Sequence, residues 1–532
     1  MAMTAVLFFA QIWWSIVARF FPKTPFNPQY LVQSLPEAPP LPTSWAGRLP
    51  VPGRVEGNDI FFWLFESEIP VYDDNLIVWL NGGPGCSSLA GLLGGNGPIS
   101  FIGNSTAVER NPYSWTQLGN VLYVDQPVGA GFSTASYPYP VRNNEMVVAD
   151  FVAWLDGFLT QFPHLTSKKV HLMGESYAGI YIPYFADALL KSKNVSRSLD
   201  IRSLSLGDGS WGNAAAMSSV GIGAYMQSQA KMLKIPRDIL NAFAAADQVC
   251  GFDEVLAQAT NFPPHGKITI PGNPENFNYR RRRRRDMNNV VDSTCSISPK
   301  TVGDIDRSIF NSSCYGPCAV YSTAMDYMDT ASSAGSGIPC FDVYDIHHDC
   351  SAVPTMSLMT AFFSRPDVQD ALHVNGSGTY STCNSTILSI LLGAPSVVPP
   401  AYSILPDLVT EHNIYLHIYN GEWDMLLNHV GTELAIQNMT WRGAQGFSTA
   451  PRRPFFPDNP MPDWSLSGHP GETGELGKVA GYWGQERGVS YHLFNGAGHS
   501  VFANKPREMF AYVRDVVVGE KEVGGVEDEG HS

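Results

Sequence analysis

The sequence predicts an α/β fold, in which helices flank a mostly parallel central sheet. Short apolar runs recur along the chain, as is typical of strands that are buried on both faces. Polar residues stand just beyond several of these runs, where open α/β sheets place their functional sites. The expected strands lie near Ile60–Phe65, Leu76–Leu80, Val121–Asp125, Val170–Met173, Leu204–Gly207, Tyr415–Tyr419 and Ser490–Phe494.

The run Val170–Met173 leads into a small-residue turn around Ser176. Gly174 stands two residues before the serine and Ala178 two residues after it. Small flanking residues allow the tight strand-to-helix turn that lifts a serine oxygen clear of a sheet. A helix is expected from Ala178 to about Leu190, with its positive N-terminal end at the serine. The spacing is common by itself, so an ordinary turn with a solvated serine stays open at this point.

A glycine-rich loop, Trp79–Ser88, closes an earlier predicted strand. Three glycines and a proline in four positions cannot continue a strand, and they expose backbone N–H groups. In enzymes with a nucleophile turn of this kind, such a loop supplies one N–H of the oxyanion hole, and the residue after the nucleophile supplies the other. This predicts Gly83 and Tyr177 as the donors that hold a tetrahedral oxyanion. A tight turn beside a disulfide explains Cys86 but not the rest of the loop.

Two more predicted strands end beside residues suited to proton transfer. Asp424 follows the strand near Tyr415–Tyr419, and the glycine-flanked His499 follows the strand near Ser490–Phe494. The chain order serine, aspartate, histidine is that of the α/β-hydrolase fold rather than that of the chymotrypsin or subtilisin folds. Each residue alone would be typical of a solvated loop. Together with Ser176 they predict an α/β-hydrolase fold with a catalytic triad.

These segments resemble the serine carboxypeptidases, in the form of a secreted or vacuolar fungal-type member. The similarity runs from about Leu41 to Val516, with a poorly matching middle. The strong matches are Trp79–Ser88, Asp125–Ser133, Gly174–Gly179, Asp424 and Gly498–His499, and the weaker ones are Val343–Ile346, Phe362–Val374 and Gly481–Trp483.

The resemblance implies release of C-terminal amino acids from peptides and proteins. Ser176 would attack the scissile carbonyl and form an acyl-enzyme. His499 would take the serine proton and return it to the leaving amine, and Asp424 would orient the imidazole. An acyltransferase or esterase that uses the same triad is the alternative. A third hypothesis, a binding protein that kept the fold, is disfavoured by the intact triad.

The family's recogniser for the free terminal carboxylate maps to Trp79, Asn81 and Glu175. The Asn81 amide can donate a hydrogen bond to a carboxylate, whereas Glu175 can donate only when it is protonated. An acidic pH preference is therefore expected for peptides. By the same resemblance, Ala90 and Ser500 line the pocket for the leaving residue.

Three positions depart from the family pattern. Gly95 stands where the family usually has a second glutamate, so no like charge is expected to raise the pKa of Glu175. Glu175 should therefore ionise at a lower pH than in relatives that carry the pair. Ser500 replaces a methionine, and Phe502 replaces a proline. All three positions concern substrate recognition, so specificity is left open.

Composition agrees with a globular enzyme. The 532 residues are 44% hydrophobic and carry a formal net charge of −15, which disfavours nucleic acid as a partner. The exception is Arg280–Arg285, which we interpret as an exposed or protease-sensitive loop. Cysteines and histidines show no zinc-type spacing, so we expect neither a metal nor another cofactor. The oligomeric state is left open.

Several features predict passage through the secretory pathway. Residues 1–18 have the length and apolarity of a signal peptide, and no later run is long enough for a stable membrane anchor. Eight cysteines form an even set. The resemblance pairs Cys86 with Cys383, and the pairing of the other six cysteines stays open. Glycosylation sequons occur at Asn104, Asn194, Asn311, Asn375, Asn384 and Asn438.

The chain divides into a core and an insertion. We expect the hydrolase core at residues 41–212 and 362–518, and an inserted, disulfide-containing cap at residues 213–361. Turn residues and mixed composition distinguish the insertion from the core. Residues 519–532 form an acidic tail.

Overall fold

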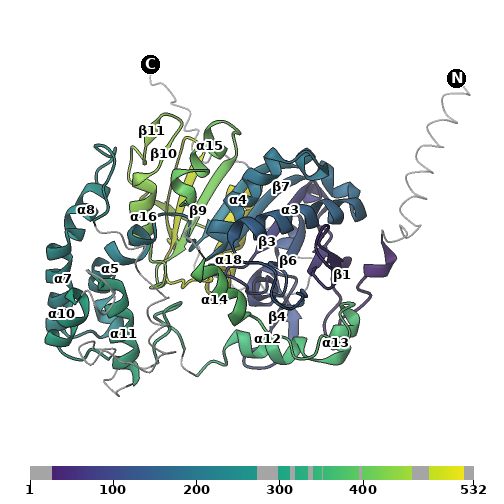
Figure 1. Ribbon diagram of the computed structural model, residues 1–532, viewed down its shortest axis with the longest axis horizontal. Helices are drawn as coiled ribbons and strands as arrows, with labels where there is room; N and C mark the ends of the chain where they lie inside the picture. The colour runs from purple at the N-terminus through teal and green to yellow at the C-terminus, as the bar shows by residue number, and fades with distance from the viewer. Residues whose placement is uncertain are drawn as a thin grey trace, which may run out of the picture.

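A computed structural model of the chain describes residues 27–271, 298–311, 318–333, 340–349, 351–394, 398–457 and 478–519. The expected signal peptide, Arg280–Arg285 and nearly all of the acidic tail lie outside these residues. A large sheet occupies the centre, and helices pack on both of its faces (Figure 1). The prediction of a mostly parallel α/β fold is confirmed. No helix among the described residues has the length and apolarity needed to cross a membrane.

Within the described residues, ten strands form the main sheet in the order β1-β2-β6-β3-β7-β8-β9-β14-β13-β12. Their bounds are β1 Ser44–Pro50, β2 Asp59–Phe65, β3 Asn75–Leu80, β6 Asn120–Asp125, β7 Lys169–Glu175, β8 Asp200–Gly207, β9 Tyr415–Gly421, β12 Arg453–Phe455, β13 Gly481–Glu486 and β14 Val489–Phe494. Two separate hairpins pair β4 (Ile99–Phe101) with β5 (Val108–Arg110) and β10 (Thr440–Trp441) with β11 (Ala444–Gln445).

The six central strands, β6 to β14 in the sheet order, are parallel to one another. Every residue of β3 and of β6 is buried, as expected for strands covered on both faces. The seven predicted strands are all present. The prediction missed the edge strand β12, which is short and largely exposed, and its neighbour β13, in which polar residues interrupt the apolar pattern.

Two hydrophobic clusters hold the helices against the sheet. One contains the apolar faces of α3 and α4, and the other contains those of α12 and α18. Described core helices are α2 Leu89–Gly91, α3 Asn144–Gln161, α4 Ala178–Lys191, α12 Thr355–Phe363, α13 Pro366–Ala371, α14 Ser385–Gly393, α15 Leu405–Thr410, α16 His429–Asn438, α17 Val501–Asn504 and α18 Pro506–Tyr512. The helix expected from Ala178 to about Leu190 is thus α4.

Helices that follow β8, within residues 222–333, gather beside the sheet, on the left in Figure 1. They are α5 Ile222–Ser228, α6 Ala230–Leu233, α7 Arg237–Cys250, α8 Phe252–Ala259, α10 Val302–Phe310 and α11 Val320–Ser333. A third hydrophobic cluster joins them, and a disulfide links Cys250 to Cys318. The core-packed helix α12 starts at Thr355, before the boundary expected at residue 362.

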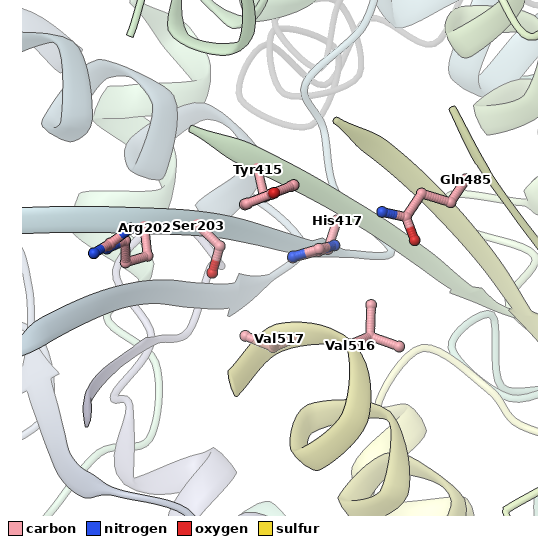
Figure 2. A pocket seen from close by; sticks show the side chains of 7 residues that line it. All are labelled: Arg202, Ser203, Tyr415, His417, Gln485, Val516 and Val517. Carbon is pink, nitrogen blue, oxygen red and sulfur yellow. The ribbon is translucent and has the colours of Figure 1, made fainter. Parts of the chain in front are cut away.

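Three buried histidines lie within the sheet, at His171 in β7, His417 in β9 and His492 in β14. Burial lowers the pKa of each to about 3. The ring Nδ1 of His171 lies 2.8 Å from Ser203 Oγ. Figure 2 shows Ser203 and His417 together at a small pocket. The pocket is lined by Arg202, Ser203, Tyr415, His417, Gln485, Val516 and Val517.

We predict that these histidines limit stability in acid. Below about pH 6.5 these histidines are protonated in the unfolded chain but stay neutral in the native protein. As the pH falls from there towards about 3, each histidine therefore lowers the free energy of unfolding by about 1.4 kcal/mol per pH unit. His171→Gln removes one such group. Its melting temperature should lie below that of the wild type at pH 7, and the gap should narrow towards pH 5.

The exposed His412 offers a matched control for this measurement. His412→Gln should follow the wild-type melting curve over the whole range. A gap between His171→Gln and the wild type that stays constant with pH would show that His171 does not titrate on unfolding.

Candidate active site

The turn after β7 has the geometry of a nucleophile elbow. Ser176 adopts a left-handed backbone conformation with φ of 63°, which is uncommon for residues other than glycine. Its N–H donates to the Gly207 carbonyl at 2.9 Å, and its carbonyl accepts from Ser210 N at 3.0 Å. The strained turn is therefore held from β8 and from the loop that follows it.

The small residues around the elbow are required by close backbone contacts. A Cβ added at Gly174 would lie 2.2 Å from the carbonyl oxygen of Leu80 and 2.8 Å from Cβ of Ala178. A Cβ added at Gly179 would lie 2.7 Å from Ser210 N. These distances are too short for real Cβ atoms, so the flanking glycines are set by packing, as the sequence pattern predicts.

The histidine and the aspartate of the predicted triad meet directly. His499 Nδ1 lies 2.8 Å from Asp424 Oδ2, and both side chains are buried. The other carboxylate oxygen, Asp424 Oδ1, accepts from the N–H groups of Leu426 at 2.8 Å and Leu427 at 3.2 Å. Among the described residues, His499 Nε2 has no hydrogen-bond partner. That nitrogen is therefore available to accept the serine proton.

A hydrogen bond joins the residue that precedes Ser176 to the residue that follows His499. Ser500 Oγ, which follows His499, donates to Glu175 Oε1 at 3.3 Å, and Glu175 precedes Ser176. The carboxyl ends of β7 and β14 thus bring the nucleophile and the base to the same edge of the sheet. Apo enzymes often hold the serine and histidine too far apart for a hydrogen bond, and this distance shortens when substrate binds.

The pKa of His499 is raised above its ordinary value. Burial alone lowers this pKa, but the charge of Asp424, the hydrogen bond to it and the nearby Glu175 outweigh that effect. A raised pKa strengthens His499 as a base and stabilises the imidazolium that forms during the reaction.

The glycine-rich loop lies against the elbow. A Cβ at Gly82 would come within 2.4 Å of Tyr177 N and 2.9 Å of Ser176 Cβ. Gly83 has a φ of 103°, which an L side chain rarely adopts. In the described part of the chain, neither the Gly83 N–H nor the Tyr177 N–H donates a backbone hydrogen bond. Both predicted oxyanion donors are thus close to the nucleophile.

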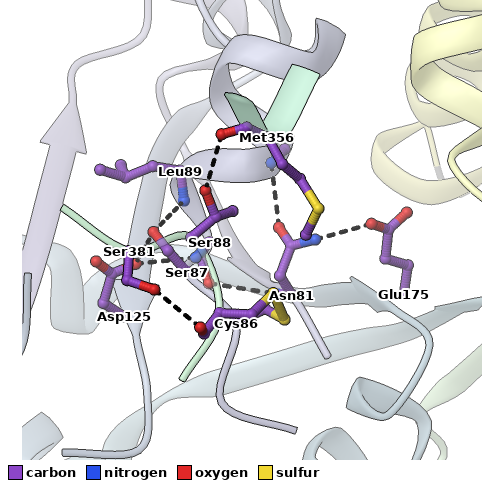
Figure 3. The surroundings of a disulfide bond; sticks show 12 residues. Asn81, Cys86, Ser87, Ser88, Leu89, Asp125, Glu175, Met356 and Ser381 are labelled. Carbon is purple, nitrogen blue, oxygen red and sulfur yellow. Dashed lines mark hydrogen bonds between the residues drawn. A yellow bond between two sulfur atoms is a disulfide. The ribbon is translucent and has the colours of Figure 1, made fainter. Parts of the chain in front are cut away.

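The residues predicted to bind a carboxylate form one hydrogen-bonded group. Asn81 Oδ1 accepts from Trp79 Nε1 at 2.7 Å and from Gly91 N at 3.1 Å. This leaves Asn81 Nδ2 to donate, and it reaches Glu175 Oε1 at 2.8 Å (Figure 3). Because the two acceptor contacts fix the amide orientation, the donor side of Asn81 must face Glu175.

Burial raises the pKa of Glu175 to about 7. Its Oε1 accepts from both Asn81 and Ser500, while its buried Oε2 has no partner among the described residues. The raised pKa arises without a second carboxyl, since position 95 is glycine. A side chain does not fit there, because a Cβ at Gly95 would lie 2.7 Å from the carbonyl oxygen of Phe502.

The loop between β3 and α2 is anchored on two sides. A disulfide joins Cys86 to Cys383, the pairing that the resemblance implied (Figure 3). The buried Asp125 accepts from Ser87 Oγ at 2.6 Å and from Ser88 N at 2.9 Å. These contacts hold the loop that carries Asn81 and Gly83 in place without substrate.

The predicted pocket residues have different surroundings. Ala90 is half-buried against the second hydrophobic cluster, and Ser500 is bonded to Glu175. Phe502 packs its ring edge-to-face on Trp79, with centroids 5.2 Å apart. An aromatic ring thus stands where the family usually has a proline, and it packs against Trp79 of the predicted carboxylate-binding group.

Two residues near the triad were missed by the sequence analysis. The ring of Tyr344 lies 5.1 Å from that of His499, and its carbonyl accepts from His499 N at 2.7 Å. Asp208, just beyond β8, lies beside Asp424. Asp208 was detectable as a polar residue after a predicted strand, and Tyr344 lies within the weak family match Val343–Ile346, which indicated no role for it.

One glycosylation prediction is contradicted. Asn438 is only 8% exposed, and its side chain bonds to both Ile268 N and Ile268 O. A glycan cannot be accommodated on this amide in the folded protein. By contrast, Asn104, Asn194 and Asn375 are exposed.

Known proteins resemble the chain over almost its whole length. A "Carboxypeptidase Y homolog" from Arthroderma benhamiae is 44% identical over 503 residues, covering 93% of this chain and 94% of that protein. The "Pheromone-processing carboxypeptidase kex1" of Aspergillus oryzae is 31% identical over 484 residues, covering 90% of this chain and 66% of that protein.

A solved structure and a family model agree with these relatives. The crystal structure of Kex1(delta)p, a prohormone-processing carboxypeptidase from Saccharomyces cerevisiae, superposes with a TM-score of 0.67 at 23% identity, covering 93% of this chain and 97% of that one, which shows a common fold. Residues 37–519 match the family model described as serine carboxypeptidase. The chain therefore belongs to the serine carboxypeptidase family and is a serine-type peptide hydrolase.

Proposed function

We propose that Ser176, His499 and Asp424 perform the carboxypeptidase reaction as a triad. Ser176 Oγ attacks the carbonyl carbon of the last peptide bond while His499 Nε2 takes its proton. His499 Nδ1 keeps its proton bonded to Asp424, so the imidazolium is stabilised by an adjacent negative charge. When the tetrahedral intermediate collapses, the C–N bond breaks and the Nε2 proton goes to the leaving amine.

Water then completes the reaction. His499 removes a proton from water, the resulting hydroxide attacks the acyl-enzyme, and Ser176 Oγ leaves with the proton returned by His499. In both halves the negative oxygen faces the N–H groups of Gly83 and Tyr177. Such preorganised donors lower the barrier because they need no reorientation as charge develops.

The selection of chain ends is assigned to Trp79, Asn81 and Glu175. Below about pH 7 a protonated Glu175 can donate from Oε2 to a terminal carboxylate, and Asn81 Nδ2 can donate beside it. Above that pH, an ionised Glu175 repels the same carboxylate. A mildly acidic preference for peptides follows, with Ala90 and Ser500 beside the departing residue.

One observation carries this assignment. Glu175 accepts hydrogen bonds from Asn81 and from Ser500. Because Glu175 precedes Ser176 and Ser500 follows His499, these bonds tie the proposed carboxylate-binding residues to the nucleophile and to the base. A substrate whose carboxylate rests on Glu175 would therefore have its last peptide bond at the nucleophile. This geometry selects the final bond of a chain over internal bonds.

We further propose a secretory or vacuolar location. Disulfides such as Cys86–Cys383 and Cys250–Cys318 persist in oxidising compartments. Exposed sequons and the predicted signal peptide are consistent with that route. Helices α5 to α11 are assigned to the predicted cap, since the segment that follows α11 places Tyr344 on the triad histidine.

Ser176→Ala should reduce kcat for N-blocked dipeptides by about 10⁴-fold or more, because the acyl-enzyme can no longer form. Release of the C-terminal amino acid measures the reaction, and circular dichroism checks the fold. Ser167→Ala, at an exposed serine remote from the elbow, is the matched control. Turnover close to the wild-type rate in Ser176→Ala would exclude Ser176 as the nucleophile.

Asn81→Ala should lower kcat/KM by about 10- to 100-fold for peptide acids, because a hydrogen bond to a charged group is lost. Esters of the blocked amino acids, which lack the free carboxylate, should be affected far less. Asn58→Ala removes a buried amide elsewhere in the fold and should leave the acid-to-ester ratio unchanged. Equal losses for acids and esters in Asn81→Ala would refute its role as a carboxylate donor.

The KM of peptide acids should rise as pH increases through about 7, since Glu175 then loses the proton it donates. The KM of esters should not follow. Glu175→Gln keeps an N–H donor at every pH, so its peptide KM should stay flat over the same range. A rise in KM that persists unchanged in Glu175→Gln would show that another group controls binding.

A further inference from the structure

Asp208 lies behind the triad, at the carboxyl end of β8. It is fully buried and has a φ of 43°. Its backbone N–H donates to the Tyr419 carbonyl at 2.9 Å. Its Oδ1 accepts from Asn420 Nδ2 at 3.0 Å and from Gly421 N at 3.0 Å. The side chain is thus held rigidly by β9, the strand that leads to Asp424.

The carboxyl group of Asp208 joins the triad cluster. One side-chain ligand atom from each of Asp208, Asp424 and His499 lies within 4.8 Å of the others, and all three residues are buried. Two ionised carboxylates this close together in a buried site repel each other, so the pair favours a proton on one of them.

The contacts of the two carboxyl groups decide where that proton resides. Each N–H donor favours the ionised form of the carboxyl group that it reaches. Asp208 accepts from two such groups, Asn420 Nδ2 and Gly421 N. Asp424 accepts from three, which are Leu426 N, Leu427 N and His499 Nδ1. Burial, followed by the charge of Asp424, raises the pKa of Asp208 well above its ordinary range. The proton therefore belongs to Asp208.

We propose that Asp208 is a positioning residue whose protonated carboxyl donates a hydrogen bond to Asp424 and holds it in line with His499. This inference rests on the proposed triad and assigns to Asp208 a role that acts through Asp424. A neutral Asp208 leaves a single negative charge behind the imidazole. A second charge there would hold the proton on His499 to higher pH and reduce the fraction of enzyme with a free base.

The remaining titratable groups around Asp208 do not supply a compensating positive charge. Those that interact with it electrostatically are buried tyrosines, and burial raises the pKa of each above its ordinary range. They are Tyr225, Tyr419 and Tyr491. Protonation of Asp208 is thus the way in which this cluster avoids two adjacent negative charges.

Asp208→Asn is the decisive variant. The asparagine keeps an acceptor for Asn420 and Gly421, offers an N–H to Asp424, and tolerates a left-handed backbone. It should retain kcat, and the acidic limb of its kcat/KM profile, which reports the pKa of His499, should coincide with that of the wild type. If Asp208 were ionised, removing its charge would move that limb to lower pH by about one unit or more and overturn the proposal.

Asp208→Gly removes the donor without straining the backbone, because glycine adopts positive φ freely. It should lower kcat by about 10- to 100-fold with little change in KM, as expected when a catalytic group is displaced by a fraction of an ångström to about 1 Å. A kcat that is retained in Asp208→Asn but lost in Asp208→Gly supports the role of Asp208 in positioning Asp424. Equal kcat in the glycine variant and the wild type would overturn it.

Stability provides a test that does not depend on catalysis. From about pH 4 upwards the unfolded chain ionises Asp208 but the native protein does not, so wild-type stability should fall with rising pH relative to Asp208→Asn. The melting temperature of Asp208→Asn, relative to that of the wild type, should therefore rise between about pH 4 and pH 7. A constant difference would overturn the proposal even if the triad itself is correct.

The same three side chains could instead hold a metal ion. In that case a chelator would abolish activity and added Zn²⁺ would restore it, and this result would also overturn the proposal. Full activity of the wild-type enzyme after dialysis against a chelator supports a protonated Asp208 rather than a bound metal ion.

Discussion

Catalytic geometry in this protein depends on how closely backbones approach at the carboxyl edge of the central sheet. Gly82 lies against Tyr177 N and Gly174 against the Leu80 carbonyl, at separations that exclude any Cβ. These contacts allow the loop after β3 and the elbow after β7 to share one small volume. Larger residues would force the oxyanion donors away from Ser176, although the sheet itself could still form.

The site combines several buried acids with little net charge. Asp424 faces donors on both of its oxygens, whereas burial raises the pKa of Glu175 to about 7 and raises that of Asp208 well above its ordinary range. Because all four groups lie close together, including His499, protonation of one affects the others. Acid keeps Glu175 and Asp208 neutral, while the buried histidines of the sheet oppose stability in acid. Function and stability therefore set opposite limits on the working pH.

The glycine at position 95 removes one of two possible causes of a raised pKa at Glu175. Burial, the other cause, raises that pKa to about 7, because desolvation acts on Glu175 whether or not another carboxyl is present. That Glu175 ionises at a lower pH than in relatives with the second glutamate stays a prediction.

The central strands, the elbow and the order of the triad residues could be predicted from the sequence, because apolar runs and small-residue turns are local patterns. The strands β13 and β12 lack that pattern; β13 pairs with β14, and the edge strand β12 pairs with β13. The contact of Tyr344 with His499, the link from Asn81 to Ser500 and the carboxyl pair of Asp208 and Asp424 join segments far apart in the chain. Burial of these groups, which determines their protonation, arises only when the strands assemble.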